Sequence, residues 1–245
     1  MQRSRTLVTG GTRGIGAAIA ERLAEAGHDL VLGYVHDDAA AELAEAACET
    51  HGVTCTLVRA DLMAEGGVEE LFAAAGPLTG VVNNAGATFH IGPLAETPVA
   101  VIRRTVDLNL TSALLVARAA VRAMSTDYGG AGGVLVNISS GAATKGSPGE
   151  YVQYAAAKAG VDALTLGLAE EVATQGVRVV GVAPGTIRTG IHADAGEPGR
   201  LDRLAPLIPM QRAGEPEEVA EAVAWLMSDA ASYVTGTTLR VAGGR

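Results

Sequence analysis

The chain has 245 residues and a net charge of −9, and its composition is 48% hydrophobic and 18% charged. This length suits one large domain or two small ones, with a core that needs no disulfide or metal. The acidic balance argues against nucleic acid and against anionic membrane surfaces as partners. The composition is too apolar for a disordered protein, and no apolar run is long enough to span a bilayer.

The first residues, MQRSRTLVTGG, carry basic side chains, but Gly10 and Gly11 end the apolar run that a signal peptide would need. We therefore expect a cytoplasmic protein. Cys48 and Cys55 suit a reducing compartment as buried free thiols, although the sequence leaves a disulfide between them open. The five histidines lack the spacing of a metal site, so no metal is expected.

Short apolar runs alternate along the chain with longer amphipathic segments. The runs predict strands and the segments predict helices. The predicted strands are Arg5–Thr9, Asp29–Tyr34, Val53–Ala60, Gly80–Asn83, Gly133–Ser139, Val177–Ala183 and Thr237–Val241. The predicted helices are Gly14–Ala26, Asp37–Thr50, Ala64–Ala75, Val99–Met124, Tyr154–Thr174 and Pro216–Ser228.

Repeated strand–helix order predicts an α/β fold with a parallel sheet, right-handed crossovers and helices on both faces. No shift in composition marks a second domain, so residues 1–245 are expected to form one doubly wound domain. Its ligand is expected beyond the carboxyl ends of the strands. The one long irregular stretch, at about 190–216, is typical of a substrate loop or lid, with a plain surface insertion as the alternative.

A glycine-rich turn, RTLVTGGTRGIG at 5–16, joins the first strand to the first helix. Gly10, Gly14 and Gly16 permit a tight turn and a close approach to a pyrophosphate. The N-terminus of the helix then offers free N–H groups to phosphates. This context favours a dinucleotide site over a purely structural turn.

The end of the second strand indicates which nucleotide binds. An acidic side chain there would bind the ribose 2′-hydroxyl of NAD(H), but the position holds Tyr34. Arg13 and His36 are placed to face a 2′-phosphate, which favours NADP(H), while Asp37–Asp38 keep NAD(H) open. Asp61, after the third strand, is expected to accept a hydrogen bond from the adenine amino group or to cap a helix.

Tyr154 and Lys158 stand four positions apart in QYAAAKAG and therefore share one helix face. A free phenol has a pKa near 10, and a fixed ammonium beside it would lower that pKa. The phenol could then exchange a proton with a carbonyl or alcohol oxygen. The alternative is a solvated lysine beside a packed tyrosine, but the pair follows the fifth strand, on the side of the sheet where the ligand is expected.

The chain resembles the short-chain dehydrogenase/reductase family over its whole length. The matching motifs are TGGTRGIG at 9–16, NNAG at 83–86, Asn109 in DLNLTS, NISS at 137–140, Tyr154 with Lys158, and APGTIRT at 183–189. The resemblance implies an oxidoreductase with a Rossmann-type sheet that assembles as a homotetramer or homodimer. It also implies a nicotinamide nucleotide as cofactor.

The resemblance implies a role for each matching residue. Tyr154 would be the general acid/base, and Lys158 would lower its pKa and bind the nicotinamide ribose. Ser140 would bind the substrate oxygen, and Asn109 would hold a proton-relaying water. With Tyr154 and Lys158, the expected cofactor contacts are Gly10, Thr12, Arg13, Gly14, Ile15, Gly16, Tyr34, His36, Asp61, Leu62, Asn84, Ala85, Gly86, Pro184, Gly185, Ile187 and Thr189.

The spacing departs from the family pattern in one place. The gap from Ser140 to Tyr154 is one residue longer than the commonest family spacing, which leaves Ser139 as the alternative to Ser140. Tyr151 is not a second candidate acid, because Ala155 stands where its lysine would have to be.

The substrate is expected to be a free small-molecule ketone or alcohol. An acidic carrier protein would need basic residues near the site, and STDYGGAGG before the fifth strand and TQG before the sixth have none. The segments SPGEYVQYAAAK and HADAGEPGRLDRLAPLIPMQR resemble a glucose-dehydrogenase-like subgroup. The expected pocket residues are Ala142, Tyr151, Ile191, His192, Leu204 and Met210, with Arg188 and Arg200 expected to be solvated.

Three alternative functions remain open at this stage. They are an NAD(H)-dependent dehydrogenase, a ketoreductase for 3-oxoacyl or polyketide-type substrates, and a non-catalytic dinucleotide-sensing protein. An intact set of Ser140, Tyr154, Lys158 and Asn109 favours an enzyme, because a sensor would be free to lose part of it.

Overall fold

The computed structural model describes residues 4–245. The expectation about a signal peptide rests partly on Met1–Arg3, which lie outside the described residues. Within the described part of the chain, no helix is long and apolar enough to cross a membrane. Cys48 and Cys55 are free and buried.

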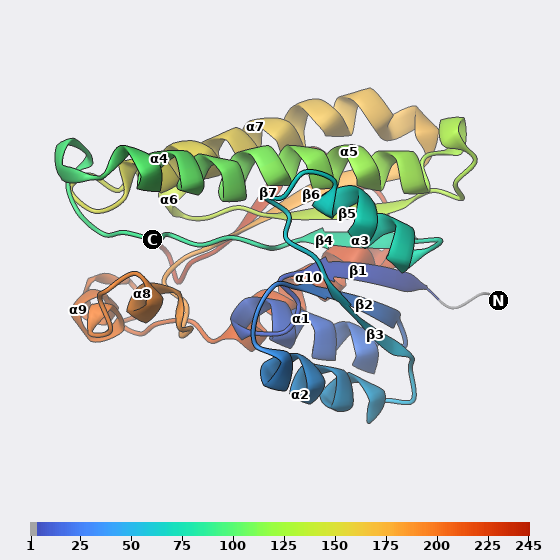
Figure 1. Cartoon of the computed structure of the whole chain (residues 1–245), viewed down its shortest axis with the longest axis horizontal. Coiled ribbons are helices and arrows are strands. Elements are labelled where there is room, and N and C mark those ends of the chain that lie inside the picture. Colours follow the sequence, from blue (N-terminus) through green and yellow to red (C-terminus); the bar gives the residue numbers. More distant parts are fainter. Residues whose placement is uncertain (1–3) are drawn as a thin grey trace.

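A seven-stranded sheet forms the centre of the molecule (Figure 1). Its order is β3-β2-β1-β4-β5-β6-β7, and every neighbouring pair is parallel. The strands are β1 (Arg5–Thr9), β2 (Asp29–Tyr34), β3 (Cys55–Arg59), β4 (Gly80–Asn83), β5 (Gly133–Ile138), β6 (Val177–Pro184) and β7 (Thr238–Val241). Because the order reverses between β1 and β4, this is the predicted doubly wound Rossmann-type fold.

Helices cover both faces of the sheet, as Figure 1 shows. On one side lie α1 (Gly14–Glu25), α2 (Asp38–Glu49) and α10 (Pro216–Met227), and on the other α3 (Gly67–Ala75), α4 (Val99–Val106), α5 (Ser112–Met124) and α7 (Val152–Val172). Successive strand residues point to opposite faces, so Val8 joins the core beneath α1 and α10 while Leu7 joins the core beneath α5. Both faces are therefore apolar, as continuous apolar strands predict.

The long helical region predicted at Val99–Met124 is interrupted by a π-helical segment, Asp107–Thr111. Asn109, at its centre, donates side-chain hydrogen bonds to the carbonyl oxygens of Thr105 and Ala87. The π-helical turn is therefore bonded to Ala87, in the loop after β4. The periodicity of the helix in the sequence does not reveal such a partner.

Short helices occupy stretches that the sequence did not assign. They are α6 (Ala142–Lys145), α8 (Ile191–Asp194), α9 (Arg200–Leu204) and the 3₁₀ turns Leu94–Glu96, Thr126–Tyr128, Ala205–Leu207 and Asp229–Ala231, while the end of the helix predicted at Tyr154–Thr174 is a 3₁₀ turn, Ala173–Gln175. The stretch at 190–216 is thus partly helical. We call its residues 190–207 the lid segment, since they hold α8, α9 and the turn that follows.

Candidate active site

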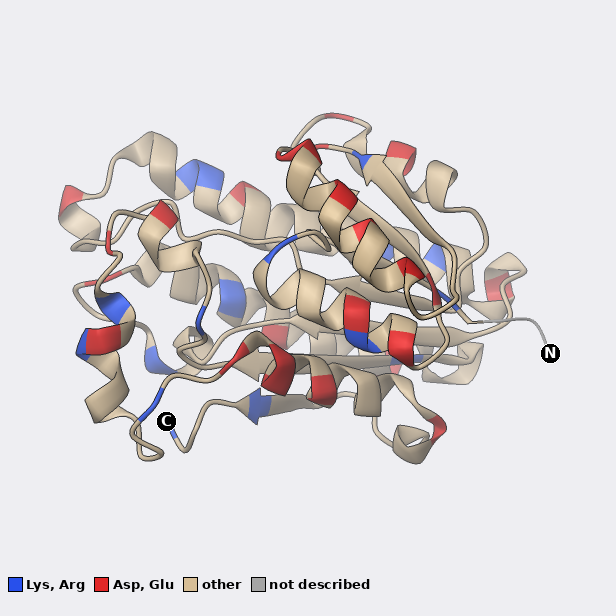
Figure 2. Ribbon diagram, turned by 90° about the horizontal axis from the view of Figure 1, so that it is seen from below, with Lys and Arg blue, Asp and Glu red and all other residues tan. Residues whose placement is uncertain are grey.

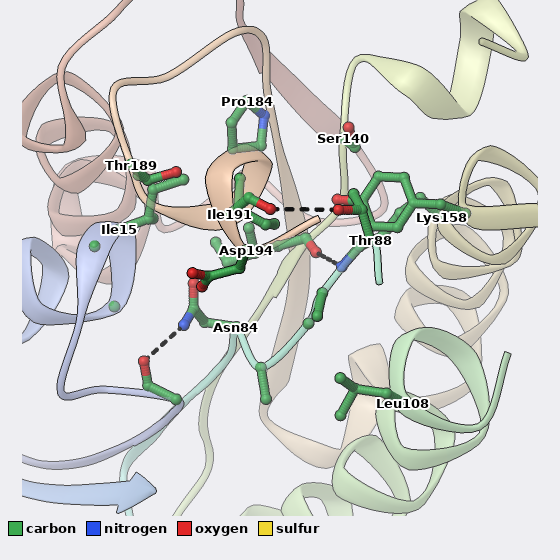
Figure 3. A pocket seen from close by; sticks show the side chains of 18 of the residues that line it. Ile15, Asn84, Thr88, Leu108, Ser140, Lys158, Pro184, Thr189, Ile191 and Asp194 are labelled. Atoms are coloured by element: carbon green, nitrogen blue, oxygen red, sulfur yellow. Dashed lines mark hydrogen bonds between the residues drawn. The ribbon is translucent and has the colours of Figure 1, made fainter. Parts of the chain in front are cut away.

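One cavity of about 620 Å³ lies at the carboxyl ends of the strands. Every residue expected to contact the cofactor lines it, and so does Ser140. In the close view of Figure 3, Ile15 and Thr189 lie on one side of the cavity and Ser140 and Lys158 on the other. The topology therefore brings the six sequence motifs to a single site, although Asn109 itself lies behind the wall, fully buried.

The glycine turn needs its glycines for two separate reasons. Gly10 and Gly14 have φ angles of +61° and +52°, which side chains with a Cβ rarely adopt. Gly16 has ordinary backbone angles, but a Cβ there would collide with the carbonyl oxygen of Gly10. The first turn of α1 is consequently packed directly against the loop that precedes it.

The N-terminus of α1 fits a diphosphate. Arg13 is the N-cap and makes no side-chain capping bond, and no acidic residue lies in the first turn. Gly14, Ile15 and Gly16, which open the helix, all line the cavity. Their N–H groups and the positive end of the helix dipole are available to an anion, which a capping carboxylate would have repelled.

The carboxylates beyond β2 are both engaged. Asp37 is the N-cap of α2 and accepts a hydrogen bond from the backbone of Ala40 at 3.0 Å. Asp38 accepts one from the Tyr34 hydroxyl at 3.0 Å and lies 3.6 Å from the guanidinium of Arg59. Neither aspartate lines the cavity, so neither is placed to accept a hydrogen bond from a ribose bound there.

Asp61 lines the same end of the cavity and accepts a hydrogen bond from the backbone of Met63 at 2.9 Å. It does not cap the next helix, because the N-cap of α3 is Gly66. The helix-capping alternative for Asp61 is therefore wrong. Its second carboxylate oxygen makes no contact that competes with an adenine.

Lys158 and Tyr154 lie on α7 and are almost completely buried, with exposed fractions of 4% and 8%. The Lys158 ammonium donates a hydrogen bond to the carbonyl oxygen of Ile138, the last residue of β5, at 2.8 Å. Burial lowers the pKa of Lys158 to about 8. The helix thus places both side chains beyond the sheet, at the end where the cavity lies.

The pKa of Tyr154 differs from the sequence-based expectation. Burial raises it above its usual value, and a hydrogen bond with Ser140 only partly opposes that effect. Lys158 contributes nothing to the shift, since its nitrogen is directed at Ile138 and lies 5.8 Å from the centre of the Tyr154 ring. In this arrangement Tyr154 is a protonated phenol at neutral pH.

The two serines at the end of β5 have different environments. The Ser139 hydroxyl is buried and donates to the carbonyl oxygen of Lys158 at 3.3 Å. The Ser140 hydroxyl lies beyond the strand, accepts a hydrogen bond from the backbone of Ala142 at 3.1 Å and contacts Tyr154. This geometry favours Ser140 over Ser139 as the partner of the phenol.

Asn109 braces the loop after β4. Its amide donates to the carbonyl oxygens of Ala87 at 2.8 Å and Thr105 at 2.9 Å, and its Oδ1 accepts from the backbone of Ala87 at 3.2 Å. A Cβ on Gly86 would meet both Asn109 and Lys158, so loop and helices are in close contact here. In this structure Asn109 holds the cavity wall.

The substrate end of the cavity agrees only partly with expectation. Ala142, Tyr151, Ile191, His192 and Leu204 line it as expected. Burial lowers the pKa of His192 to about 4, so its imidazole is neutral at physiological pH.

Two expectations at this end are wrong. Met210 is 60% exposed and does not line the cavity, because it follows the turn that ends the lid segment and lies against Gly243. Arg200 is not solvated but has a side chain only 2% exposed. Arg188 is exposed, as expected, and it also pairs with Glu215.

Sequence reasoning missed several residues of the cavity wall. Thr88 donates to the carbonyl oxygen of Ile191 at 3.4 Å and so ties the loop after β4 to the lid segment (Figure 3). Arg104, Lys145 and Arg245 also line the cavity. They come from three separate elements, and only the folded chain brings these cations together.

Comparison with known proteins adds a family assignment to this geometry. The family model described as enoyl-(acyl carrier protein) reductase matches residues 10–245. The chain is 46% identical over 243 residues to "Uncharacterized oxidoreductase YgfF" of Escherichia coli, covering 98% of both chains. It is 36% identical over 248 residues to the 3-oxoacyl-(acyl-carrier-protein) reductase FabG of Aquifex aeolicus, covering 100% of this chain and 98% of that one.

The solved structures agree with the sequence relatives. Levodione reductase superposes with a TM-score of 0.91 at 31% sequence identity, covering 98% of this chain and 96% of that one. The similarity extends over the sheet, both helical layers and the lid segment alike, since nearly the full length of both chains is covered.

Proposed function

Because this chain belongs to the short-chain dehydrogenase/reductase family and is an NAD(P)-dependent oxidoreductase, we propose that it uses NADP(H) to interconvert a small-molecule ketone and its alcohol. One observation carries the proposal. A single cavity is lined at one end by the glycine turn and at the other by Ser140, Tyr154 and Lys158.

The diphosphate of the nucleotide would lie on Gly14, Ile15 and Gly16, where the N–H groups of α1 are free of side-chain caps. Asn84, Ala85 and Gly86 would line the adenosine side. Pro184, Gly185, Ile187 and Thr189 would contact the nicotinamide, with Thr189 binding its carboxamide. Bound there, the nucleotide supplies the reducing equivalent, or accepts it in the reverse direction.

NADP(H) is preferred in this proposal on two grounds. Asp37 and Asp38 pair with α2, Tyr34 and Arg59, and neither lines the cavity, so neither is placed to bind a ribose 2′-hydroxyl. Arg13 is exposed, lines the cavity and makes no salt bridge among the described residues, which leaves its guanidinium available to a 2′-phosphate. His36 lines the same end of the cavity.

Tyr154 would exchange the proton. Its burial keeps the phenol protonated at neutral pH, which suits donation to a carbonyl oxygen as the alcohol forms. Ser140 would hold that oxygen through the hydroxyl that contacts Tyr154. Lys158, charged below pH of about 8, would bind the nicotinamide ribose. Asn109 would keep the loop at Ala87 in place.

A second candidate substrate is a 3-oxoacyl group on an acidic carrier protein. The loops before β5 and β6 hold no basic residue, but Arg104, Lys145 and Arg245 line the cavity. Burial lowers the pKa of Lys145, and the neighbouring Arg245 and Arg240 lower it further, with no opposing effect from an acidic group of the described residues. Such a group of cations suits an acidic partner or an anionic substrate.

We also propose that the protein assembles as a homotetramer or homodimer. Figure 1 shows α4, α5 and α7 forming one outer layer of the molecule. Leu114 and Leu115 of α5 are 46% and 39% exposed on it and line a shallow groove together with Leu164 and Leu168 of α7. Exposed leucines on neighbouring helices form an apolar patch of the kind that subunit contacts cover.

A substrate panel tests the proposed function. Ketones, sugars, secondary alcohols and carrier-linked 3-oxoacyl groups would be incubated with each nucleotide while the absorbance of the reduced nicotinamide is followed. Turnover of free ketones with NADPH supports the main proposal, and turnover of only carrier-linked groups supports the second. Tight nucleotide binding without turnover of any of them would favour a dinucleotide-sensing protein.

A further inference from the structure

Arg200 lies at the start of α9 and is the largest fully buried side chain in the described part of the protein. Its guanidinium donates to Glu150 at 2.5 Å, to Glu197 at 2.8 Å and to the Tyr151 hydroxyl at 2.8 Å. A buried guanidinium pays a desolvation cost that only such close partners offset. This side chain is therefore held in one place rather than left to solvent.

The cluster around Arg200 is neutral as a whole. Arg203 adds ion pairs to the same two acids, at 3.2 Å to Glu150 and 2.5 Å to Glu197. Burial raises the pKa of Glu150, but the hydrogen bonds and charges of Arg200 and Arg203 outweigh it and leave that pKa below its usual range. Two cations and two anions balance one another, and Arg200, Glu150 and Tyr151 stand in the wall at the substrate end of the cavity.

The cluster joins two distant parts of the chain. Arg200, Arg203 and Glu197 belong to the lid segment, whereas Glu150 and Tyr151 come just before α7. Figure 2 shows the small α9 helix, with its basic residues in blue, at the edge of the molecule away from the N-terminus. The lid segment is thus pinned to the segment that leads into the catalytic helix.

The contacts continue from Tyr151 to Tyr154. The Arg200 guanidinium carbon lies 4.8 Å from the centre of the Tyr151 ring. That ring meets the Tyr154 ring edge to face, with centres 5.4 Å apart and planes at 85°. Edge-to-face packing fixes the relative orientation of two rings. An unbroken series of contacts therefore runs from the lid segment to the proposed proton donor.

We propose that Arg200 is a positioning residue, which holds the lid segment over the substrate end of the cavity and holds Tyr151 against Tyr154. The inference rests on the proposed function, because it assigns Tyr154 the proton transfer. A guanidinium suits the role because its planar fork binds two acids and a hydroxyl at fixed angles, which an ammonium cannot reproduce. Buried polar clusters of this kind favour one arrangement of their surroundings over others.

The matched control is Arg203. It lies on the same helix and binds the same two acids, but its side chain is 50% exposed and it makes no contact with Tyr151. Arg203→Met removes one cation from the cluster, as Arg200→Met does, without removing the contact to the tyrosine. A difference between the two variants therefore reports what Arg200 alone has, its burial and its contact with Tyr151, and Tyr151→Phe then isolates the contact.

The kinetic experiment compares wild type, Arg200→Met, Arg200→Lys and Arg203→Met with a saturating nucleotide. We expect kcat to fall about 10- to 100-fold in Arg200→Met, since small misplacements of a catalytic group have effects of this size. Arg200→Lys is expected to fall in between, and Arg203→Met to stay within about 3-fold of wild type. The Kd for NADPH is expected to stay within about 2-fold throughout, because the cluster lies away from the glycine turn.

Tyr151→Phe keeps the proposal testable if Arg200→Met does not fold. This variant retains the ring but loses the hydrogen bond to Arg200. If Arg200 acts through Tyr151, the double variant Arg200→Lys with Tyr151→Phe has the same kcat as Arg200→Lys alone. Independent, additive losses in the double variant would overturn the inference.

Hydrogen exchange of the lid segment separates this inference from the proposed function, because it needs no substrate. We expect the backbone amides of residues 190–207 to exchange at least about 10-fold faster in Arg200→Met than in Arg203→Met. Equal exchange in the two variants, or equal kcat values, would overturn the positioning role. If the wild type turns over no substrate but Arg200→Met still exchanges faster than Arg203→Met, the proposed function is refuted. The conclusion that Arg200 pins the lid segment then remains.

Discussion

The Lys158 nitrogen lies 5.8 Å from the centre of the Tyr154 ring and donates its hydrogen bond to the carbonyl oxygen of Ile138 at 2.8 Å. The two side chains share one face of α7, as their spacing predicts, yet the lysine is held by the end of β5. Both are buried, so the protein carries the cost of an ammonium inside its core. That cost has a measurable pH dependence.

The free energy of unfolding of the wild type should therefore rise with pH relative to that of Lys158→Met, which lacks the ammonium. In the unfolded chain Lys158 keeps its proton up to pH 10.5, but in the folded protein it loses it near pH 8. Between these values the unfolded state binds more protons, so the free energy of unfolding increases with pH. Relative to Lys158→Met, we expect wild type to gain on the order of 3 kcal/mol over this range.

Urea unfolding of wild type and Lys158→Met across the same pH range measures this difference. Other titrating groups act equally in both proteins and cancel in the comparison. A difference that stays constant with pH would mean that Lys158 titrates in the folded protein as it does in the unfolded chain.

Gly16→Ala should abolish nucleotide binding. The added Cβ would collide with the carbonyl oxygen of Gly10 and force the glycine turn away from α1. We expect the Kd for NADPH to rise at least about 100-fold, since the phosphates lose most of their backbone donors. Isothermal titration calorimetry provides the measurement.

The matched control for this change is Gly167→Ala. Gly167 lies inside α7 and does not line the cavity. Nothing lies within 4 Å of the position that a Cβ would take there. We expect unchanged nucleotide affinity and a gain in stability of about 0.5–1 kcal/mol from the better helix propensity. Normal binding by Gly16→Ala would show that the turn does not hold the diphosphate.

Arg13→Ala should remove most of the preference for NADPH over NADH. A charge-assisted bond to a 2′-phosphate is worth about 1.5–3 kcal/mol, which corresponds to a ratio of roughly 10- to 100-fold in Kd. We expect wild type to show a ratio in this range and the variant a ratio near one, measured by titration with both nucleotides.

Arg188→Ala serves as the comparison for Arg13→Ala, because Arg188 is exposed, paired with Glu215 and outside the cavity. It should leave the ratio unchanged. Equal affinities of wild type for the two nucleotides would contradict the assignment of Arg13 and favour a dual-specificity enzyme.

The sequence predicted the sheet and the main helices well because both rest on local patterns. Continuous apolar runs fix strands buried on both faces, and Gly10, Gly14 and Gly16 fix the first turn. The residues expected to contact the nucleotide all line one cavity, since parallel strands bring all their carboxyl ends to one edge.

The errors concern side chains whose environment depends on distant partners. Arg200 reads as a surface residue in a charged loop, but Glu150 and Tyr151, about 50 positions earlier, bury it. Burial likewise reversed the expected direction of the pKa shift of Tyr154, which spacing alone does not reveal.

The most direct test of the account is the turnover of Tyr154→Phe. The change keeps the buried ring and removes only the hydroxyl that contacts Ser140. We expect kcat to fall about 100- to 10,000-fold, the usual contribution of a positioned general acid, while the Kd for NADPH stays within about 2-fold of wild type. Tyr233→Phe, at a fully exposed tyrosine, should behave as wild type. Undiminished turnover by Tyr154→Phe would contradict the central claim, because the proton would then have to come from another group.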